Sequence, residues 1–492
     1  MAMTPLLGFL PDANPDTPGV MTECRHIIPY EQGFLGAPVG SAANVAVLAA
    51  ECRGARVITK LDETRRIFAG TQTKLYELTG TTWTDRSAGG GSYTGSLDSR
   101  WIYAQFGDTT IASNLIDDMQ SSTSGAFSAI AGAPKAKVVV SAANNFVIAF
   151  NTNDASFGVS PDRWWCCAQN DQTNWTPSLA TGATTGRLIA TAGAIQAALP
   201  LGDYVVAYKN RGIYVGSFVG AAQGSWQWNL AADSSLAGCV GAEAVCEISG
   251  GAHFLVGPDD FWIFDGTSRP VSIGQGIRDW FRLNANQTYL YRAKCAFDAQ
   301  RNIIWVSYVS AANSTGAVND SVLAFHLPTK KWGADNYNVE AFLTFTAPGV
   351  VIDGLDAYAS TIDTLPPIPF DSAYWLSGSR TFAYFSSAHH LSTKGGACAD
   401  SGFTTGDVGD DQVWTMLEYA RLRWYEVPSA AQAQHQWSEF SGAPLQAGTT
   451  EAIHDGRFEF HTSARWHRLA FTFTGNHRES AIDFVMSAES DQ

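Results

Sequence analysis

The sequence predicts an all-β protein, in which a β-propeller of about six four-stranded blades is followed by a β-rich C-terminal module. Apolar and polar residues alternate at period two, as they do in strands, and glycine interrupts the runs roughly every 8–12 residues. The chain carries 46 Gly with 16 Trp, 16 Tyr and 27 Phe, a composition typical of short strands and tight turns. In addition, one hairpin theme recurs along the first 340 residues.

Six copies of this theme define the expected blades. Each copy joins two apolar runs through a small or polar turn, and an aromatic residue often closes it. The copies cover residues 67–85, 101–114, 137–152, 204–230, 253–274 and 302–333. Their central strands begin 36 to 58 residues apart, and four-stranded propeller blades recur at about 40–50 residues. The uneven spacing predicts a diverged propeller, with a β-sandwich or stacked sheets as the alternative.

The alternation also predicts which side chains form the core. In a strand, every second residue faces the same side, so the apolar positions of the central strands should be buried. The expected core residues are Val205, Val206, Ile213, Phe254, Ile263, Ile304 and Val306.

Three segments follow from this pattern. Residues 1–45 read as an extended lead-in that supplies a strand elsewhere, and residues 46–345 as the propeller. Residues 346–492 read as a β-rich module that either completes the ring or forms a separate platform. Within it, residues 361–375 are irregular and Pro-rich, and residues 380–393 predict a strand or hairpin.

Long alternating strands are expected near the C-terminus of the chain. In the clearest of them, Leu469, Phe471 and Phe473 fall on one face, while Arg468, Ala470 and Thr472 fall on the other.

Charge and cysteine content limit the function classes. Lys and Arg number 31 against 46 Asp and Glu, which gives a net charge of −15 and no polybasic run. Because DNA affinity grows with the number of phosphates that cations neutralise, tight sequence-reading binding is not expected. No apolar stretch approaches the roughly 18 residues of a membrane span, and no targeting segment is visible. The eight scattered cysteines form no C-x-x-C pair, which predicts free thiols, no disulfides and a reducing cytoplasm.

Catalytic motifs are not found. The sequence has no G-x-S-x-G, no H-E-x-x-H and no phosphate-binding P-loop, and residues 182–187 (GATTGR) resemble the last only superficially. The acid pairs Asp117-Asp118 and Asp259-Asp260 are adjacent, so their carboxylates should point apart rather than flank a glycosidic bond. We therefore predict no catalytic, cofactor-binding or metal-binding residues and no cofactor.

Three groups of residues in the sequence contain side chains of the kind that bind metal ions. Cys166-Cys167 should point to opposite faces of a strand, one thiol buried and one exposed. His389-His390, with Cys398 and Asp400 nearby in sequence, are read as a polar turn or strand edge. Asp407, Asp410 and Asp411 form an oxygen-rich turn in which calcium stays an open alternative, although the spacing is not that of an EF-hand.

Several segments, in this order along the chain, resemble one family. They are residues 68–87, 100–114, 259–266, 273–281, 361–375, 404–412 and 456–475. Together they are similar to the packaged-DNA stabilisation proteins of short-tailed phages, also described as tail hubs or nozzles. The resemblance runs from about residue 60 to 485, while loops at 153–163 and 310–320 look specific to this chain.

The resemblance implies a non-enzymatic structural protein of the virion tail, assembled in the host cytoplasm. Family members form a ring, expected to be hexameric, below the portal and the adaptor, where it continues the DNA channel and retains the packaged genome until ejection. The implied partners are further copies of the chain, the tail adaptor, other tail proteins including fibres, and genomic DNA that passes without sequence-specific binding; no membrane contact is implied. A propeller enzyme or lectin acting on host surface polysaccharide is the alternative.

Overall fold

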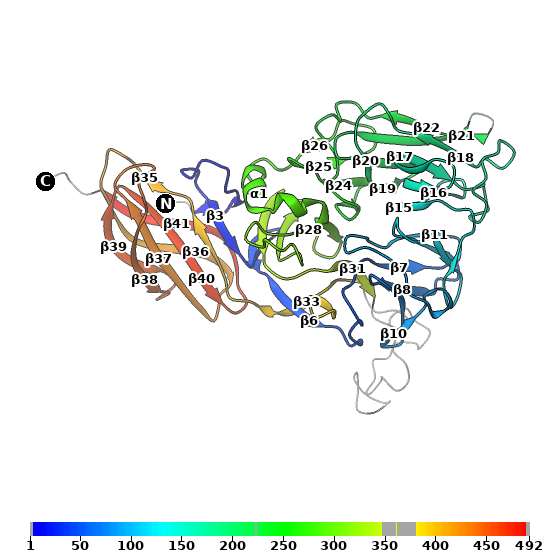
Figure 1. The fold of residues 1–492 in the computed structure, drawn as a ribbon. Helices are drawn as coiled ribbons and strands as arrows, with labels where there is room; N and C mark the ends of the chain where they lie inside the picture. The colour runs from blue at the N-terminus through cyan, green and yellow to red at the C-terminus, as the bar shows by residue number, and fades with distance from the viewer. Residues whose placement is uncertain (1–2, 222–223, 347–360, 362–379, 489–492) are drawn as a thin grey trace.

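The chain folds into two β-rich bodies, a propeller and a β-sandwich, that lie side by side (Figure 1). The computed structural model describes residues 3–221, 224–346, 361 and 380–488. Within these residues the one α-helix is α1 (Arg278–Asn284), and nearly all other regular structure is strand. The all-β prediction is therefore confirmed.

The six predicted blades are all present as antiparallel four-stranded units between Ala55 and Asp335. Their strands are β7 (Ala55–Thr59), β8 (Arg65–Gly70), β9 (Leu75–Thr79), β10 (Thr82–Asp85); β11 (Ile102–Phe106), β12 (Thr109–Ser113), β13 (Gln120–Ser122), β14 (Ser128–Ala129); β15 (Lys135–Ala142), β16 (Phe146–Asp154), β17 (Gly158–Cys166), β18 (Thr184–Arg187); β19 (Ile195–Leu201), β20 (Tyr204–Lys209), β21 (Ile213–Gly220), β22 (Ser225–Leu230); β23 (Val245–Ile248), β24 (Ala252–Val256), β25 (Phe261–Phe264), β26 (Val271–Ser272); and β27 (Lys294–Asp298), β28 (Ile303–Tyr308), β29 (Ser321–His326), β30 (Lys331–Asp335).

A further four-stranded sheet closes the ring. It combines β31 (Ala341–Thr346), β32 (Arg380–Phe385) and β33 (Leu391–Cys398) with β6 (Pro38–Ala42) from the start of the chain. The first strands contact one another in ring order, from β7 through β11, β15, β19, β23 and β27 to β31, which contacts β7 again. The propeller thus extends beyond 46–345, because its closing sheet takes strands from both flanking segments.

Blade faces pack against neighbouring blades, so both sides of a strand are buried. The expected core residues Val205, Val206, Ile213, Phe254, Ile304 and Val306 are all buried. Ile263 is only partly buried, because it lies in β25 beside the outermost strand β26, where the paired Val271 is exposed. The core prediction therefore holds for every residue except Ile263.

The sandwich consists of two sheets that enclose one apolar core. One carries β4 (Ile27–Tyr30), β5 (Gly33–Gly36), β41 (Arg478–Ala488), β36 (Thr415–Glu426) and β39 (Phe458–Ala464), with β1 (Thr4–Pro5) on β41. The other carries β2 (Gly8–Phe9), β3 (Val20–Arg25), β34 (Ser401–Thr405), β40 (Trp466–Thr474), β37 (Ala430–Ser438) and β38 (Gln446–Ala452), with β35 (Val408–Gly409) on β40. Leu469, Phe471 and Phe473 share one face of β40, as predicted, and this face is buried in the core.

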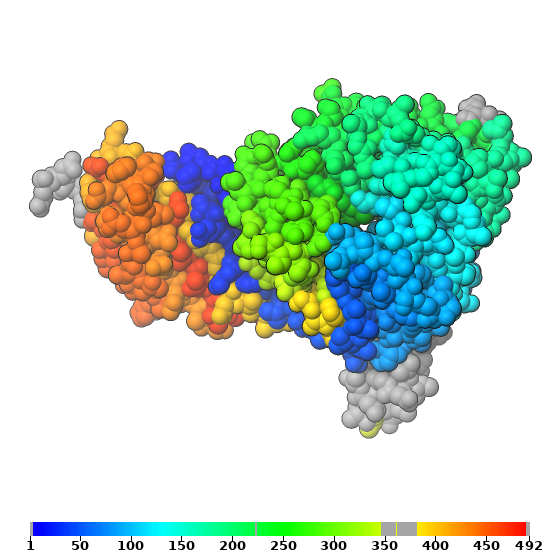
Figure 2. Space-filling view, viewed as in Figure 1, coloured from blue at the N-terminus to red at the C-terminus, as the bar shows by residue number. Residues whose placement is uncertain are grey.

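The N-terminal segment holds the two bodies together. Strand β4 pairs with β30 of the sixth blade, so one ten-stranded sheet runs from the propeller into the sandwich. In the space-filling view the blue N-terminal residues lie between the orange-red sandwich and the green blades (Figure 2). The lead-in does supply strands elsewhere, and the C-terminal module both completes the ring and forms a separate body. The Pro-rich segment 361–375 lies outside the described residues except for Thr361.

One of the two expected loops is a strand hairpin. Residues 153–163 belong largely to β16 and β17, which run on as a nine-residue pair of strands to the turn at 155–157. Residues 310–320 do form a loop between β28 and β29, in which the Asp320 carboxylate accepts hydrogen bonds from the backbone and hydroxyl of Ser310, both at 2.7 Å.

Candidate functional site

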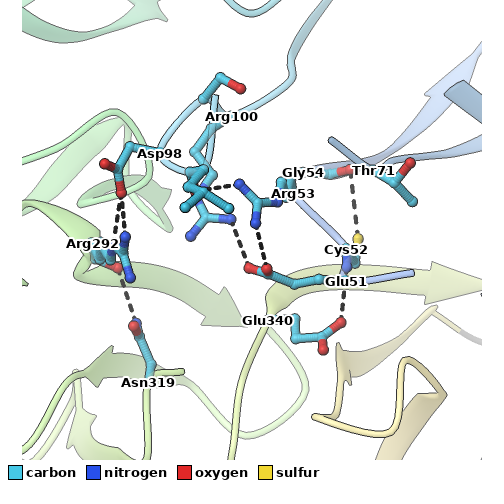
Figure 3. A network of polar contacts seen from close by, with 12 residues as sticks. Glu51, Cys52, Arg53, Gly54, Thr71, Asp98, Arg100, Arg292, Asn319 and Glu340 are labelled. Carbon is cyan, nitrogen blue, oxygen red and sulfur yellow. Dashed lines mark hydrogen bonds and ion pairs between the residues drawn. The ribbon is translucent and has the colours of Figure 1, made fainter. Parts of the chain in front are cut away.

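A network of polar contacts links residues from several blades of the propeller (Figure 3). The first strands of the blades contact one another around the ring, and ion pairs bring together residues that lie at the starts of several of them. Charged residues lie there before β7, β11, β23 and β31, and at the start of β27: Glu51, Arg53, Arg100, Glu243, Lys294 and Glu340.

Ion pairs connect these side chains from blade to blade. Arg53 donates to Glu51 at 2.6 Å, and Arg100 lies 3.3 Å from the other oxygen of the same carboxylate. Arg100 also lies 3.6 Å from Glu243, which is 3.3 Å from the Lys294 ammonium. These contacts join the starts of four first strands, β7, β11, β23 and β27, into one rim in which Arg53 and Lys294 are buried.

Glu340 links the closing sheet to this rim. One carboxylate oxygen of Glu340 accepts a hydrogen bond from the Cys52 backbone at 2.8 Å, and the other lies 2.6 Å from the His389 ring. The backbone carbonyl of Glu340 accepts from the Lys294 ammonium at 2.6 Å. Burial raises the pKa of Glu340 and lowers the pKa of Lys294. Both groups have hydrogen-bonding partners on other segments, so each links two parts of the ring.

A loop of the second blade contacts the segment before the sixth blade. Asp98, on the loop before β11, accepts from Arg292 and from the Tyr291 hydroxyl, both at 3.0 Å, on the segment before β27. Asn319 in turn donates to the Arg292 carbonyl at 3.0 Å. The rim and this loop hold four cations and four carboxylates, namely Arg53, Arg100, Arg292, Lys294, Glu51, Asp98, Glu243 and Glu340. This balanced arrangement links blades that are far apart in sequence.

His389 and His390 lie in the turn between β32 and β33, as predicted, and His389 has a positive φ of 59°. His389 bonds to Glu340, and His390 bonds to the Leu391 carbonyl at 2.9 Å. Within the part of the chain that the structure describes, no group of three or more His, Cys, Asp or Glu side chains is arranged to hold a metal ion.

The aspartates of the 404–412 turn have separate partners. Asp407 pairs with Arg468 at 2.7 Å and 2.9 Å, and Asp410 accepts from the Gln412 backbone at 2.7 Å. Asp411 accepts from the Trp466 indole at 2.6 Å and from the Ser441 backbone at 2.7 Å. The structure therefore does not bring the three carboxylates together around one cation.

The paired acids also diverge. Asp117 accepts from Thr94 while Asp118 lies 3.5 Å from Lys135. Asp259 pairs with Arg211, whereas the buried Asp260 accepts from Ser272 at 2.6 Å. Each carboxylate thus fixes its own turn, and neither pair flanks a shared cleft.

Sequence reasoning missed a Ser–His–Glu chain in the sandwich. The Ser401 hydroxyl lies 2.6 Å from Nε2 of His477, and Nδ1 of His477 lies 2.6 Å from Glu479. This is the bonding order of a hydrolase triad. All three side chains are buried, however, so a substrate has no access, and the chain joins the two sheets instead. No local motif announces it, because Ser401 lies 76 residues from His477.

The cysteines differ from expectation at one site. Both Cys166 and Cys167 are buried, because Cys166 packs toward the fourth blade and Cys167 toward the second. The prediction that one of them is exposed was wrong. All eight cysteines carry free thiols, and burial raises the pKa of Cys24, Cys166 and Cys167 to about 12.

We expect thiol titration without reductant to count close to eight groups in the denatured chain. In the folded protein at pH 8 most of these thiols should react slowly, because burial disfavours the thiolate that attacks the reagent. A count near zero after denaturation would contradict the prediction.

The fold defines the chain as a β-propeller protein with an attached β-sandwich. No protein-family model and no curated protein matches it. Among solved structures it is similar to YCF48 from Cyanidioschyzon merolae, with 12% identity over 72% of this chain and 98% of that chain and a TM-score of 0.39. It is also similar to YCF48 bound to D1 peptide, with 12% identity over 75% of this chain and 97% of that chain and a TM-score of 0.38. A third similar structure is AFV00434, an ancestral GH74 enzyme, with 11% identity over 75% of this chain and 46% of that chain and a TM-score of 0.37. These likenesses concern architecture and say nothing about activity.

No helix among the described residues is long and apolar enough to cross a membrane.

Proposed function

We propose that the chain is a non-enzymatic structural subunit of a short-tailed phage tail, in which a ring of copies forms the nozzle below the adaptor and helps to retain packaged DNA. The sequence resemblance supports this role. So does the low charge content of 16%, against about 25% in an ordinary soluble domain. A surface with few charges suits a subunit that neighbours cover.

The observation that carries the proposal is an exposed apolar patch on the third blade. It consists of Phe157, Val159 and Ile189, which are 51%, 72% and 73% exposed. Val159 lies in β17, and Ile189 follows the end of β18. The two strands are neighbours, since Arg163 pairs with Arg187. The Phe157 ring, in the turn before β17, lies 3.6 Å from the Arg163 guanidinium. Several large apolar side chains exposed on one blade suit a contact with another protein.

The patch makes the proposal testable in virions. We expect a Val159→Asp, Ile189→Asp double variant to enter tails about 100-fold less efficiently, since it places two charges in a desolvated contact. Particles that lack the chain should package DNA and then lose it, which nuclease-protected DNA per particle measures. Leu283→Asp, at a side chain 79% exposed on α1, is the matched control and should assemble normally.

Two results would contradict this role. Virions that lack the chain yet keep their DNA and stay infectious would exclude retention. Normal incorporation of the double variant would exclude the patch as the contact.

We also expect no hydrolysis of capsule, lipopolysaccharide or peptidoglycan. The Ser401 hydroxyl is buried, so a fluorophosphonate probe should not label the folded chain. Labelling that disappears in Ser401→Ala, together with cleavage of any of these substrates, would favour an enzyme instead.

A further inference from the structure

The sandwich holds a cavity of about 340 Å³ beside an open strand edge. One edge of β41 pairs with β36 as far as Ala488. The other edge pairs with β1 only as far as Ile482 in the part of the chain that the structure describes, so the edge beyond Ile482 is open there. Beyond that point Phe484 and Met486 line the cavity, together with Trp466 and Val408. The volume falls within the roughly 300–1,000 Å³ of ligand pockets.

The walls of the cavity are fixed in place. The Asp407 backbone donates to the Pro15 carbonyl at 2.8 Å, and the Gly406 backbone donates to Val20 at 3.0 Å, so two loops far apart in sequence are joined. A Cβ on Gly406 would lie 2.1 Å from the Pro15 carbonyl oxygen, so this approach requires glycine. A site built this way needs little ordering when a ligand enters.

The charge at the cavity is one-sided. Three carboxylates line it, and no Lys, Arg or His does. Asp407 is paired with Arg468 and Asp483 with Arg421, the latter at 2.8 Å. Asp16 is exposed at the cavity and forms no ion pair with any described residue. A ligand that fits therefore brings an apolar side chain for the interior and a cation for Asp16.

We propose that this cavity is a docking site for an extended segment of a partner protein that alternates apolar and basic residues. Its backbone adds a strand to the open edge of β41, one apolar side chain enters between Trp466 and Phe484, and a Lys or Arg reaches Asp16. Strand addition supplies affinity through the main chain, and the pocket supplies specificity. The assignment goes beyond the proposed tail role, because it concerns the sandwich and not the ring contact.

Two labelled peptides test the site on the full chain by fluorescence anisotropy. Acetyl-KVTVKV-amide should bind at least about fivefold tighter than acetyl-EVTVEV-amide, and Asp16→Lys should reverse this order, since one exposed ion pair is worth up to about 1 kcal/mol. Val408→Trp, which fills the cavity, should abolish binding of both peptides. Asp203→Lys changes an exposed acid in a propeller turn and should have no effect.

Equal binding of the two peptides, or an unchanged order in Asp16→Lys, would overturn the proposal. Because Asp16 is exposed, this variant tests the site even if Val408→Trp fails to fold. Self-association that Val408→Trp abolishes, seen by sedimentation without peptide, would also overturn it by assigning the site to a second copy of the chain.

Discussion

Replacing Asp335 by alanine is expected to lower the free energy of unfolding by about 3–5 kcal/mol, because it leaves a buried ammonium without a counter-charge. The Asp335 carboxylate lies 2.6 Å from the Lys394 ammonium and 2.6 Å from the His26 ring. The side chains of Asp335 and Lys394 are only 2% and 3% exposed. Burial alone would raise the pKa of Asp335, but Lys394 and the hydrogen bond to His26 outweigh it and hold this pKa below its ordinary value.

The position of this pair explains why its loss should affect the whole molecule. Asp335 ends β30 of the sixth blade, Lys394 lies in β33 of the closing sheet, and His26 precedes β4 of the sandwich. Lys394 also donates to the Pro38 carbonyl at 3.1 Å and lies 3.6 Å from the Tyr337 ring centroid. The contacts therefore hold ring closure and the sandwich together.

Urea denaturation measures the effect. The double variant Asp335→Ala, Lys394→Met should be more stable than Asp335→Ala alone, because it removes the stranded charge. Glu459→Ala breaks an exposed pair with Arg457 and should cost no more than about 1 kcal/mol. A loss below about 1 kcal/mol for Asp335→Ala would show that water or another group solvates Lys394.

The propeller was predictable because its repeat is local. Each blade is contiguous in sequence, and period-two alternation identifies its buried strands, as Val205 and Val206 illustrate. The closing sheet was not predictable in the same way. It pairs Thr393 with Ser41, and no local pattern reports a contact between strands so far apart in sequence.

The candidate site depends on contacts of the same kind. Glu51, Lys294 and Glu340 look like isolated surface charges until the ring brings the starts of its first strands together. Cys166 and Cys167 show the converse error. Alternation correctly separates their two faces, but a blade has a neighbour on each side, so facing away from one core does not mean exposure.

Acid is expected to destabilise the protein between about pH 6.5 and pH 4, before most carboxylates titrate. Burial lowers the pKa of His253 to about 4, and burial together with the adjacent His467 lowers the pKa of His435 to about 4. A histidine in the unfolded chain titrates near pH 6.5, so in this range the unfolded state binds more protons than the folded state. The free energy of unfolding therefore decreases as the pH falls. Each imidazole should contribute a loss of roughly 3 kcal/mol by pH 4.

This range differs from that of the buried ion pair. Because the pKa of Asp335 is lowered, its contribution is present above the ordinary Asp value of about 3.9 and is lost only as the pH falls below it. Glu340 and Glu479 have raised pKa values caused by burial, so their protonation favours the folded state as the pH falls and opposes the histidines. A difference between variants is therefore more informative than the wild-type profile alone.

His435→Gln isolates the imidazole contribution. His435 lies 2.9 Å from the His467 ring, and glutamine keeps a hydrogen-bond donor there without a group that titrates. Between pH 7 and pH 4, urea unfolding should show a loss of stability about 3 kcal/mol smaller in His435→Gln than in the wild type. His454→Gln removes a histidine whose side chain is 80% exposed and should leave the wild-type profile unchanged. If the His435→Gln and wild-type profiles coincide, His435 binds its proton equally well in the folded and unfolded states, and the acid sensitivity arises from other groups such as His253.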